Sequence, residues 1–225
     1  MQVWEEGRKR HPVDRALLLH SCANPESDPG MLADQPLGRR NRALLALREA
    51  CFGPWALIPL DCPCCGAPQE LEINLADLRE RLASQPDPIE VEGLRFRLPS
   101  GRDLIRVASE QDEAEATRKL LKACLILAPG EALPASLPPP EIVGEAFAHA
   151  DPLAAPSLDC QCPACEHRWG ADYDILSAFW QELDEEANRL IDQVHRLASA
   201  YGWHETDILR MSESRRLSYL SRLQP

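Results

Sequence analysis

Apolar residues near the end of the chain recur at alternating steps of four and three residues. This heptad spacing predicts one long helix over 176–201 that packs along a single seam. Gly202, directly after the last seam residue, is a typical helix end. The pattern fits both packing within the chain's own domain and docking on a partner. The seam residues are Leu176, Trp180, Leu183, Ala187, Leu190, Val194, Leu197 and Tyr201.

Two further helices are predicted at 13–22 and 36–52, where apolar positions form one face among charged residues. Short helices are predicted at 76–83, near 140–149, at 204–211 and at 213–223. Ser109 followed by Asp112 resembles a capping box, which would open another helix reaching Cys124. Five prolines within 129–140 predict a semi-rigid linker.

Strands are predicted at 55–60 and 70–75, on either side of a cysteine-rich turn. Polar and apolar residues alternate in Glu70–Leu75, which is typical of a half-buried strand. A hairpin is predicted over 89–107, with Pro99-Ser-Gly-Arg102 as its turn and Leu104 to Val107 on its second arm.

The cysteines form an internal repeat. Leu60-Asp-Cys-Pro-Cys-Cys-Gly66 is similar to Leu158-Asp-Cys-Gln-Cys-Pro-Ala-Cys165, and each contains Cys-Pro-x-Cys. A tight turn of this type directs two thiolates at one point, and two such turns provide the four sulfurs of a tetrahedral Zn²⁺ site. The predicted ligands of this structural zinc are Cys62, Cys65, Cys162 and Cys165.

Several alternatives stay open at these cysteines. Cys64, Cys160 or His167 could replace a neighbouring ligand, and iron could replace zinc. Cys-Pro-x-Cys is also a thiol-redox pattern, although strand-like rather than helical sequence follows it here. Four thiolates leave no position for water, so this site is not predicted to be a catalytic zinc. Cys22, Cys51 and Cys124 are interpreted as small buried apolar residues.

The predicted fold class is α+β, with a zinc-ribbon-like four-cysteine unit built from two distant knuckles. Residues 1–53 form an N-terminal helical segment, and 54–85 with 155–175 form the discontinuous zinc-ribbon-like unit. Residues 86–154 are an insertion with a hairpin, a helix and the proline-rich linker, and 176–225 form a C-terminal helical segment.

Composition narrows the possible functions. The chain of 225 residues carries 24 basic and 36 acidic residues, a net charge of −12, which argues against a nucleic-acid partner. No leader or membrane-spanning stretch is visible, so a cytoplasmic location is expected, with no membrane partner. In that reducing compartment cysteines favour metal binding over disulfides. No phosphate loop, nucleophile elbow or protease pattern indicates an enzyme.

Four stretches together resemble the T-even-type phage baseplate protein family, which also occurs in gene clusters for phage-tail-like contractile injection systems. The resemblance covers roughly residues 55–223 and is carried by Phe96–Leu104, Cys162–Trp169, Tyr201–Leu209 and Arg215–Leu220. It implies a structural component or assembly factor of the baseplate or hub. It further implies other tail subunits as partners, a possible place in an assembled particle, no catalytic residue and no small-molecule substrate. A nucleic-acid-binding zinc ribbon and a thiol-redox protein remain the alternative functions.

Overall fold

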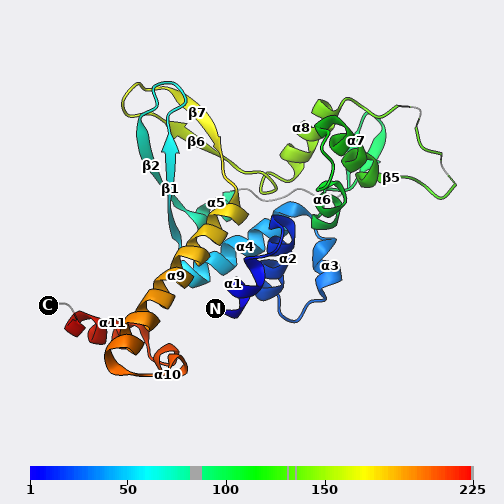
Figure 1. Ribbon diagram of the computed structural model, residues 1–225. Coiled ribbons are helices and arrows are strands. Elements are labelled where there is room, and N and C mark those ends of the chain that lie inside the picture. The colour runs from blue at the N-terminus through cyan, green and yellow to red at the C-terminus, as the bar shows by residue number, and fades with distance from the viewer. Residues whose placement is uncertain (82–87, 131, 135, 224–225) are drawn as a thin grey trace. The chain divides into compact units, whose positions relative to one another are not determined.

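The computed structural model describes residues 1–81, 88–130, 132–134 and 136–223, which adopt an α+β fold (Figure 1). Within these residues the strands form three small antiparallel sheets. The strands are β1 (Trp55–Asp61), β2 (Pro68–Asn74), β3 (Ile89–Val91), β4 (Leu94–Phe96), β5 (Leu125–Ile126), β6 (Ser157–Gln161) and β7 (Arg168–Asp172). The helices are α1 (Gln2–Gly7), α2 (Pro12–Ala23), α3 (Pro29–Ala33), α4 (Leu37–Phe52), α5 (Leu75–Arg81), α6 (Gly101–Val107), α7 (Glu113–Cys124), α8 (Pro140–Ala150), α9 (Ile175–Tyr201), α10 (Glu205–Leu209), α11 (Glu213–Leu220) and the 3-10 turn η1 (Ser221–Leu223).

The chain divides into two compact units, residues 9–178 and residues 1–8 together with 179–225. In the larger unit, α2 and α4 pack through fully buried leucines such as Leu19 and Leu44. At the end of α4 the buried Arg48 donates hydrogen bonds of 2.7 and 2.8 Å to the carbonyls of Gly53 and Trp55. These bonds fix the point at which β1 leaves the helices.

The insertion has its own core around Phe96, which is fully buried and meets the Phe147 ring edge to face at 6.2 Å. Leu121, Cys124 and Val143 complete this core between α7, α8 and the β3–β4–β5 sheet. The linker prediction falls partly on residues 131 and 135, which lie outside the described residues; the rest of 127–139 contains no helix or strand.

The hairpin prediction for 89–107 was wrong in its second half. The turn lies at Glu92 and Gly93, whose φ angles of 49° and 78° are both left-handed, as a tight hairpin turn requires. Residues after Pro99 form α6 instead, because Ser100 and Asp103 make the capping box that was assigned to Ser109 and Asp112. Asp112 alone caps α7, accepting hydrogen bonds from the Ala114 and Glu115 amides.

The smaller unit joins the short helix α1, which the sequence pattern did not predict, to the rest of α9 and the C-terminal helices. The Trp4 indole donates a 2.7 Å hydrogen bond to Asp184, and the absence of a side chain at Gly7 leaves room for the Trp180 ring. Leu197, Ile208 and Leu220 form the second core. The buried seam residues of α9 in this unit, Trp180, Ala187 and Leu197, therefore support the interpretation of packing within the chain.

An ion pair with a buried carboxylate ties the start of α6 to β4 and α7. Arg97 donates to both carboxylate oxygens of Asp103, at 2.6 and 2.8 Å, and to the Ala123 carbonyl at 2.8 Å. The hydroxyl and amide of Ser100 also donate to Asp103. Burial disfavours the charged carboxylate, but the hydrogen bonds from Arg97 and Ser100 outweigh this effect and lower the pKa of Asp103 to about 2.

A carboxylate with a depressed pKa stabilises the fold above its ordinary pKa and loses that effect as the pH falls through the folded value. We expect Asp103→Asn to reduce the free energy of unfolding by about 2 kcal/mol at neutral pH. The difference in unfolding free energy between this variant and the unsubstituted chain should shrink as the pH falls from 3.8, the usual pKa of aspartate, to about 2. Urea unfolding from pH 7 to pH 2 measures it, with the exposed Asp172→Asn as the control. A difference that does not change over this range would contradict the assignment.

Candidate metal centre

The two Cys-Pro-x-Cys segments are the turns of two hairpins with the same construction. The β1–β2 hairpin turns through 62–67, and the β6–β7 hairpin turns through 162–167. In the first turn the Cys62 carbonyl accepts from the Gly66 amide at 2.8 Å, and the Cys62 amide donates to Ala67 at 3.0 Å. In the second, Cys162 makes the same two bonds, with Glu166 at 2.9 Å and His167 at 2.8 Å.

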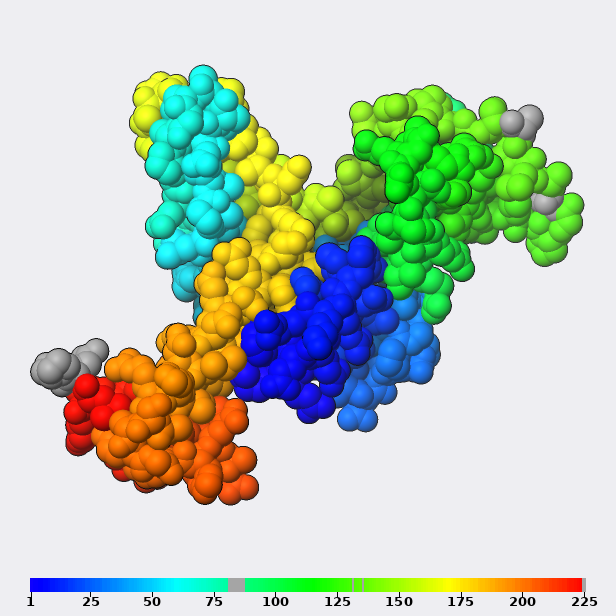
Figure 2. Space-filling view, viewed as in Figure 1, coloured from blue at the N-terminus to red at the C-terminus, as the bar shows by residue number. Residues whose placement is uncertain are grey.

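Each hairpin buries one face. On β1 and β6 the buried residues alternate with exposed ones, so that Ala56, Leu158 and Cys160 lie inward. Figures 1 and 2 show the cyan β1–β2 hairpin beside the yellow β6–β7 hairpin. Their turns therefore lie at the same end, although about a hundred residues separate them in sequence.

The four predicted ligands meet at this end. The Cys62 and Cys165 sulfurs lie 3.7 Å apart, and so do the Cys65 and Cys162 sulfurs. All four sulfurs lie within 4.8 Å of one another. A tetrahedron of thiolates with metal–sulfur bonds of about 2.3 Å has edges of about 3.8 Å, whereas a disulfide bond is about 2.05 Å long. The geometry is thus that of a four-sulfur metal site, and it confirms the prediction of one centre built from two distant knuckles.

The electrostatics of the cluster also favour a cation. Backbone amides of Cys165 and Ala164 direct hydrogen bonds at the Cys162 sulfur and lower the pKa of that thiol to about 7. The His167 amide similarly favours the Cys165 thiolate, yet burial and the three neighbouring sulfurs raise the pKa of Cys165 to about 12. Four negative sulfurs at one point repel one another unless a positive ion lies between them, and a divalent ion removes this repulsion.

The spare candidates lie outside the cluster. Cys64 is exposed at the tip of its turn, and Cys160 is buried on the inner face of β6, where its thiol donates to the Leu158 carbonyl. His167 stacks on the Trp169 ring with 6.0 Å between centroids. Of the three other cysteines, Cys124 is buried as expected; Cys22 and Cys51 are exposed, which corrects their interpretation as buried apolar residues.

Comparisons with protein families, with curated proteins and with solved structures found no match. Among the helices of the described residues, none combines the length and the apolar character needed to cross a bilayer. Function must therefore be argued from the site and its surroundings.

Replacing one ligand should release the metal. We expect Cys162→Ser to lose most of the bound metal and to expose 158–175 to protease, because three thiolates hold an ion less tightly than four. Metal analysis and limited proteolysis measure both effects. Cys64→Ser, in the other turn but outside the cluster, is the matched control and should keep its metal. A Cys162→Ser protein with full metal content and unchanged protease resistance would disprove the paired site.

The left-handed position of each turn offers a second test. Gly66 has a φ of 70°, and Glu166 occupies the equivalent position with a φ of 60°. A side chain in this conformation costs about 1 kcal/mol, a cost that glycine does not carry. We expect Glu166→Gly to raise the stability of the metal-bound protein by about 0.5–1 kcal/mol, and Gly66→Ala to lower it similarly. Thermal unfolding of both variants measures the change in stability. If both substitutions stabilise the protein, or both destabilise it, the interpretation is wrong.

Proposed function

We propose that this chain is a non-enzymatic structural or assembly protein that acts through protein–protein contacts and is stabilised by a structural zinc ion. The four-sulfur cluster is the observation that supports this proposal most. Four protein thiolates fill the tetrahedron, so no position is left for a water molecule or a substrate. Zinc is the metal most commonly held in such closed thiolate sites, and iron is the alternative that spectroscopy distinguishes.

The site suits a structural role rather than a catalytic one. The metal joins Cys62 to Cys165 and Cys65 to Cys162, pairs that are 103 and 97 residues apart. Structural zinc contributes on the order of 10 kcal/mol to the folding of the unit that binds it. Both ends of the intervening insertion are thereby held together, and each hairpin keeps a defined orientation to its partner.

The resemblance to phage baseplate proteins gives this proposal its finer form. The protein would then be a component or assembly factor of the baseplate or hub of a contractile tail or injection system, and its partners would be other tail subunits. The stretches that carry the resemblance include the second knuckle, Cys162–Trp169, and the C-terminal residues Tyr201–Leu209 and Arg215–Leu220.

The surroundings of the knuckles weigh against the alternative of a nucleic-acid-binding zinc ribbon. Three carboxylates are exposed close to the two turns and offset the positive charge of Arg168. They belong to Asp61, Asp159 and Glu166. Phosphate contacts need clustered cations, and exposed carboxylates next to them repel a nucleic-acid backbone. The net charge of −12 instead suits basic protein partners.

Metal analysis tests the structural part of the proposal. We expect the purified full-length protein to be colourless and to contain about one zinc ion per chain. A red protein with the visible absorption of an iron–thiolate centre would show that the bound metal is iron and not zinc. Metal-free protein that reduces disulfides would support the thiol-redox alternative instead.

Recovery of partners from the native host tests the finer part. Affinity purification of the tagged full-length chain, followed by mass spectrometry, should enrich tail or baseplate subunits. The Cys162→Ser protein should recover them less efficiently, and Cys64→Ser should recover them as well as the unsubstituted chain. Enrichment of ribosomal or polymerase subunits, with a salt-dependent shift of DNA or RNA, would overturn the proposal in favour of nucleic-acid binding.

A further inference from the structure

The outward face of the β1–β2 hairpin exposes a row of apolar side chains. Trp55 is 55% exposed and Leu57 is 64% exposed, and Pro59 follows at the next outward position. Adjacent exposed apolar side chains are typical of interaction surfaces, and aromatic residues are enriched at the centres of protein interfaces.

Acidic residues form a second row next to this one. In the register of the hairpin, Leu57 lies opposite Glu72 and Pro59 lies opposite Glu70. Both glutamates are exposed on their strand, and no ion pair joins either of them to a cation of residues 1–81, 88–130, 132–134 or 136–223. Neighbouring strands lie about 5 Å apart, so the apolar and acidic rows run side by side.

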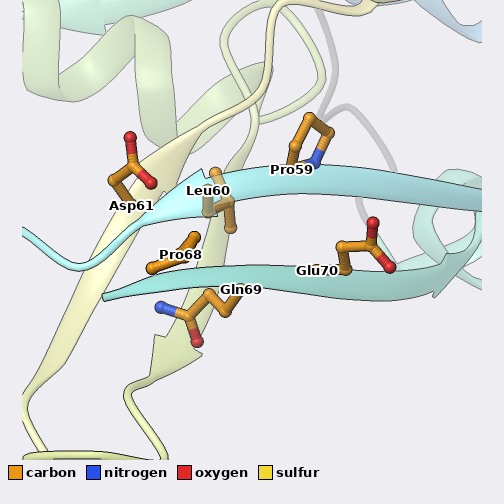
Figure 3. Close-up of a pocket in the computed structure, with 6 residues that line it drawn as sticks. All are labelled: Pro59, Leu60, Asp61, Pro68, Gln69 and Glu70. Atoms are coloured by element: carbon orange, nitrogen blue, oxygen red, sulfur yellow. The ribbon is translucent and has the colours of Figure 1, made fainter. Parts of the chain in front are cut away.

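Two hollows next to the β1–β2 hairpin also have carboxylates in their lining. One, of about 420 Å³, is lined by Pro59, Leu60, Asp61, Pro68, Gln69 and Glu70 (Figure 3). The other, of about 410 Å³, is lined by Glu72, Ile73, Asn74, Asp77, Leu78, Glu80 and Leu158. Neither lining set includes lysine, arginine or histidine. Both hollows therefore add acidic and no basic side chains near Glu70 and Glu72.

The second hairpin shows that the metal site does not require this surface. When the two knuckles are aligned, Leu57 corresponds to Ser157 and Pro59 corresponds to Asp159. The outward face of β6–β7 is accordingly polar, whereas its turn makes the same backbone hydrogen bonds as the turn of β1–β2. The apolar row is thus specific to one hairpin, and the shared metal-binding construction does not explain it.

We propose that the acidic–apolar face, formed by Trp55, Leu57, Pro59, Asp61, Glu70 and Glu72, docks a basic segment of another protein subunit. Such a segment would place apolar side chains on the β1 row and lysine or arginine side chains on the β2 row. This proposal rests on the proposed function, because it names the surface and the chemistry of a protein partner.

Charge decides between the possible occupants. A second copy of this chain would bring the same carboxylates and a net charge of −12 to the contact. A phosphate backbone or an anionic lipid surface would meet the same repulsion. A basic segment with apolar residues compensates Glu70 and Glu72 while covering Trp55 and Leu57, so it is the occupant that the face fits.

Photocrosslinking from this face in the native host tests the proposal. The photoreactive residue benzoylphenylalanine replaces Leu57 in the full-length chain, and retained metal content shows that the variant folds. We expect crosslinks to a protein segment that carries a net positive charge among apolar residues. Raising the salt concentration of the purified complex from about 0.1 to about 1 M, which shortens the Debye length from about 10 to about 3 Å, should weaken the contact.

Charge reversal supplies the matched control. In the Leu57-crosslinking chain, Glu70→Lys with Glu72→Lys should reduce the crosslink yield about tenfold or more, since two opposite-charge contacts become like-charge contacts. Asp159→Lys with Asp172→Lys makes the same charge change on the outward face of β6–β7 and should leave the yield nearly unchanged. Equal effects of the two double variants would overturn the proposed face.

The remaining outcomes separate this proposal from the proposed function. Crosslinks from Leu57 to an acidic segment, to nucleic acid or to a second copy of the chain overturn the proposed occupant. If position 57 gives no crosslink but benzoylphenylalanine at the exposed Leu217 captures a tail subunit, the face is wrong and the proposed function stands. If neither position captures a tail subunit and affinity purification recovers none, both proposals fail.

Discussion

The convergence of four sulfur atoms is the interaction on which the architecture of the larger unit depends. A two-stranded hairpin is marginally stable by itself in water, because it buries too little apolar surface. Each hairpin here buries only a few small or medium side chains on its inner face, such as Ala56 on β1 and Leu158 on β6. A metal held by both turns would supply the free energy that such a thin core lacks, at the point where the two chain segments meet.

The two knuckles repeat one local design with different residues. Each closes on the same pair of backbone hydrogen bonds, and each needs one residue in the left-handed region directly after its second cysteine. Glycine meets this need in the first turn, while Glu166 adopts the conformation in the second. A metal bound by both turns would hold Glu166 in this backbone conformation, which is otherwise unfavourable for a residue with a side chain.

The shared design makes the differences between the hairpins informative. The two turns share their cysteines and their backbone hydrogen bonds, whereas Leu57 and Pro59 of β1 correspond to Ser157 and Asp159 of β6. One hairpin presents tryptophan and leucine beside glutamates, and the other presents serine and aspartate. Since the metal and the inner face are indifferent to this change, the outward composition is free to serve contacts with other molecules.

Much of this organisation follows from the sequence alone. The Cys-Pro-x-Cys repeat indicated the four ligands, because a tight turn between two cysteines has few ways to direct their sulfurs, but it left Cys64, Cys160 and His167 open as replacements. The heptad pattern determined α9, since a period of three and four residues fits only a helix with one packed side. Local signals were less decisive where two of them competed. The sequence around Pro99–Arg102 suits a turn, but Asp103 reaches back to Ser100, pairs with Arg97 and starts a helix.

Only the tertiary structure decided which residues from distant parts of the sequence contact one another. It brought Cys62 within 3.7 Å of Cys165, left Cys64 and Cys160 outside the cluster, and joined α1 to Trp180 and Asp184. It also decided that Trp55 and Leu57 face outward, because alternation along a strand defines two faces without saying which one is covered. Sequence spacing fixes local geometry, whereas burial depends on contacts between segments a hundred residues apart.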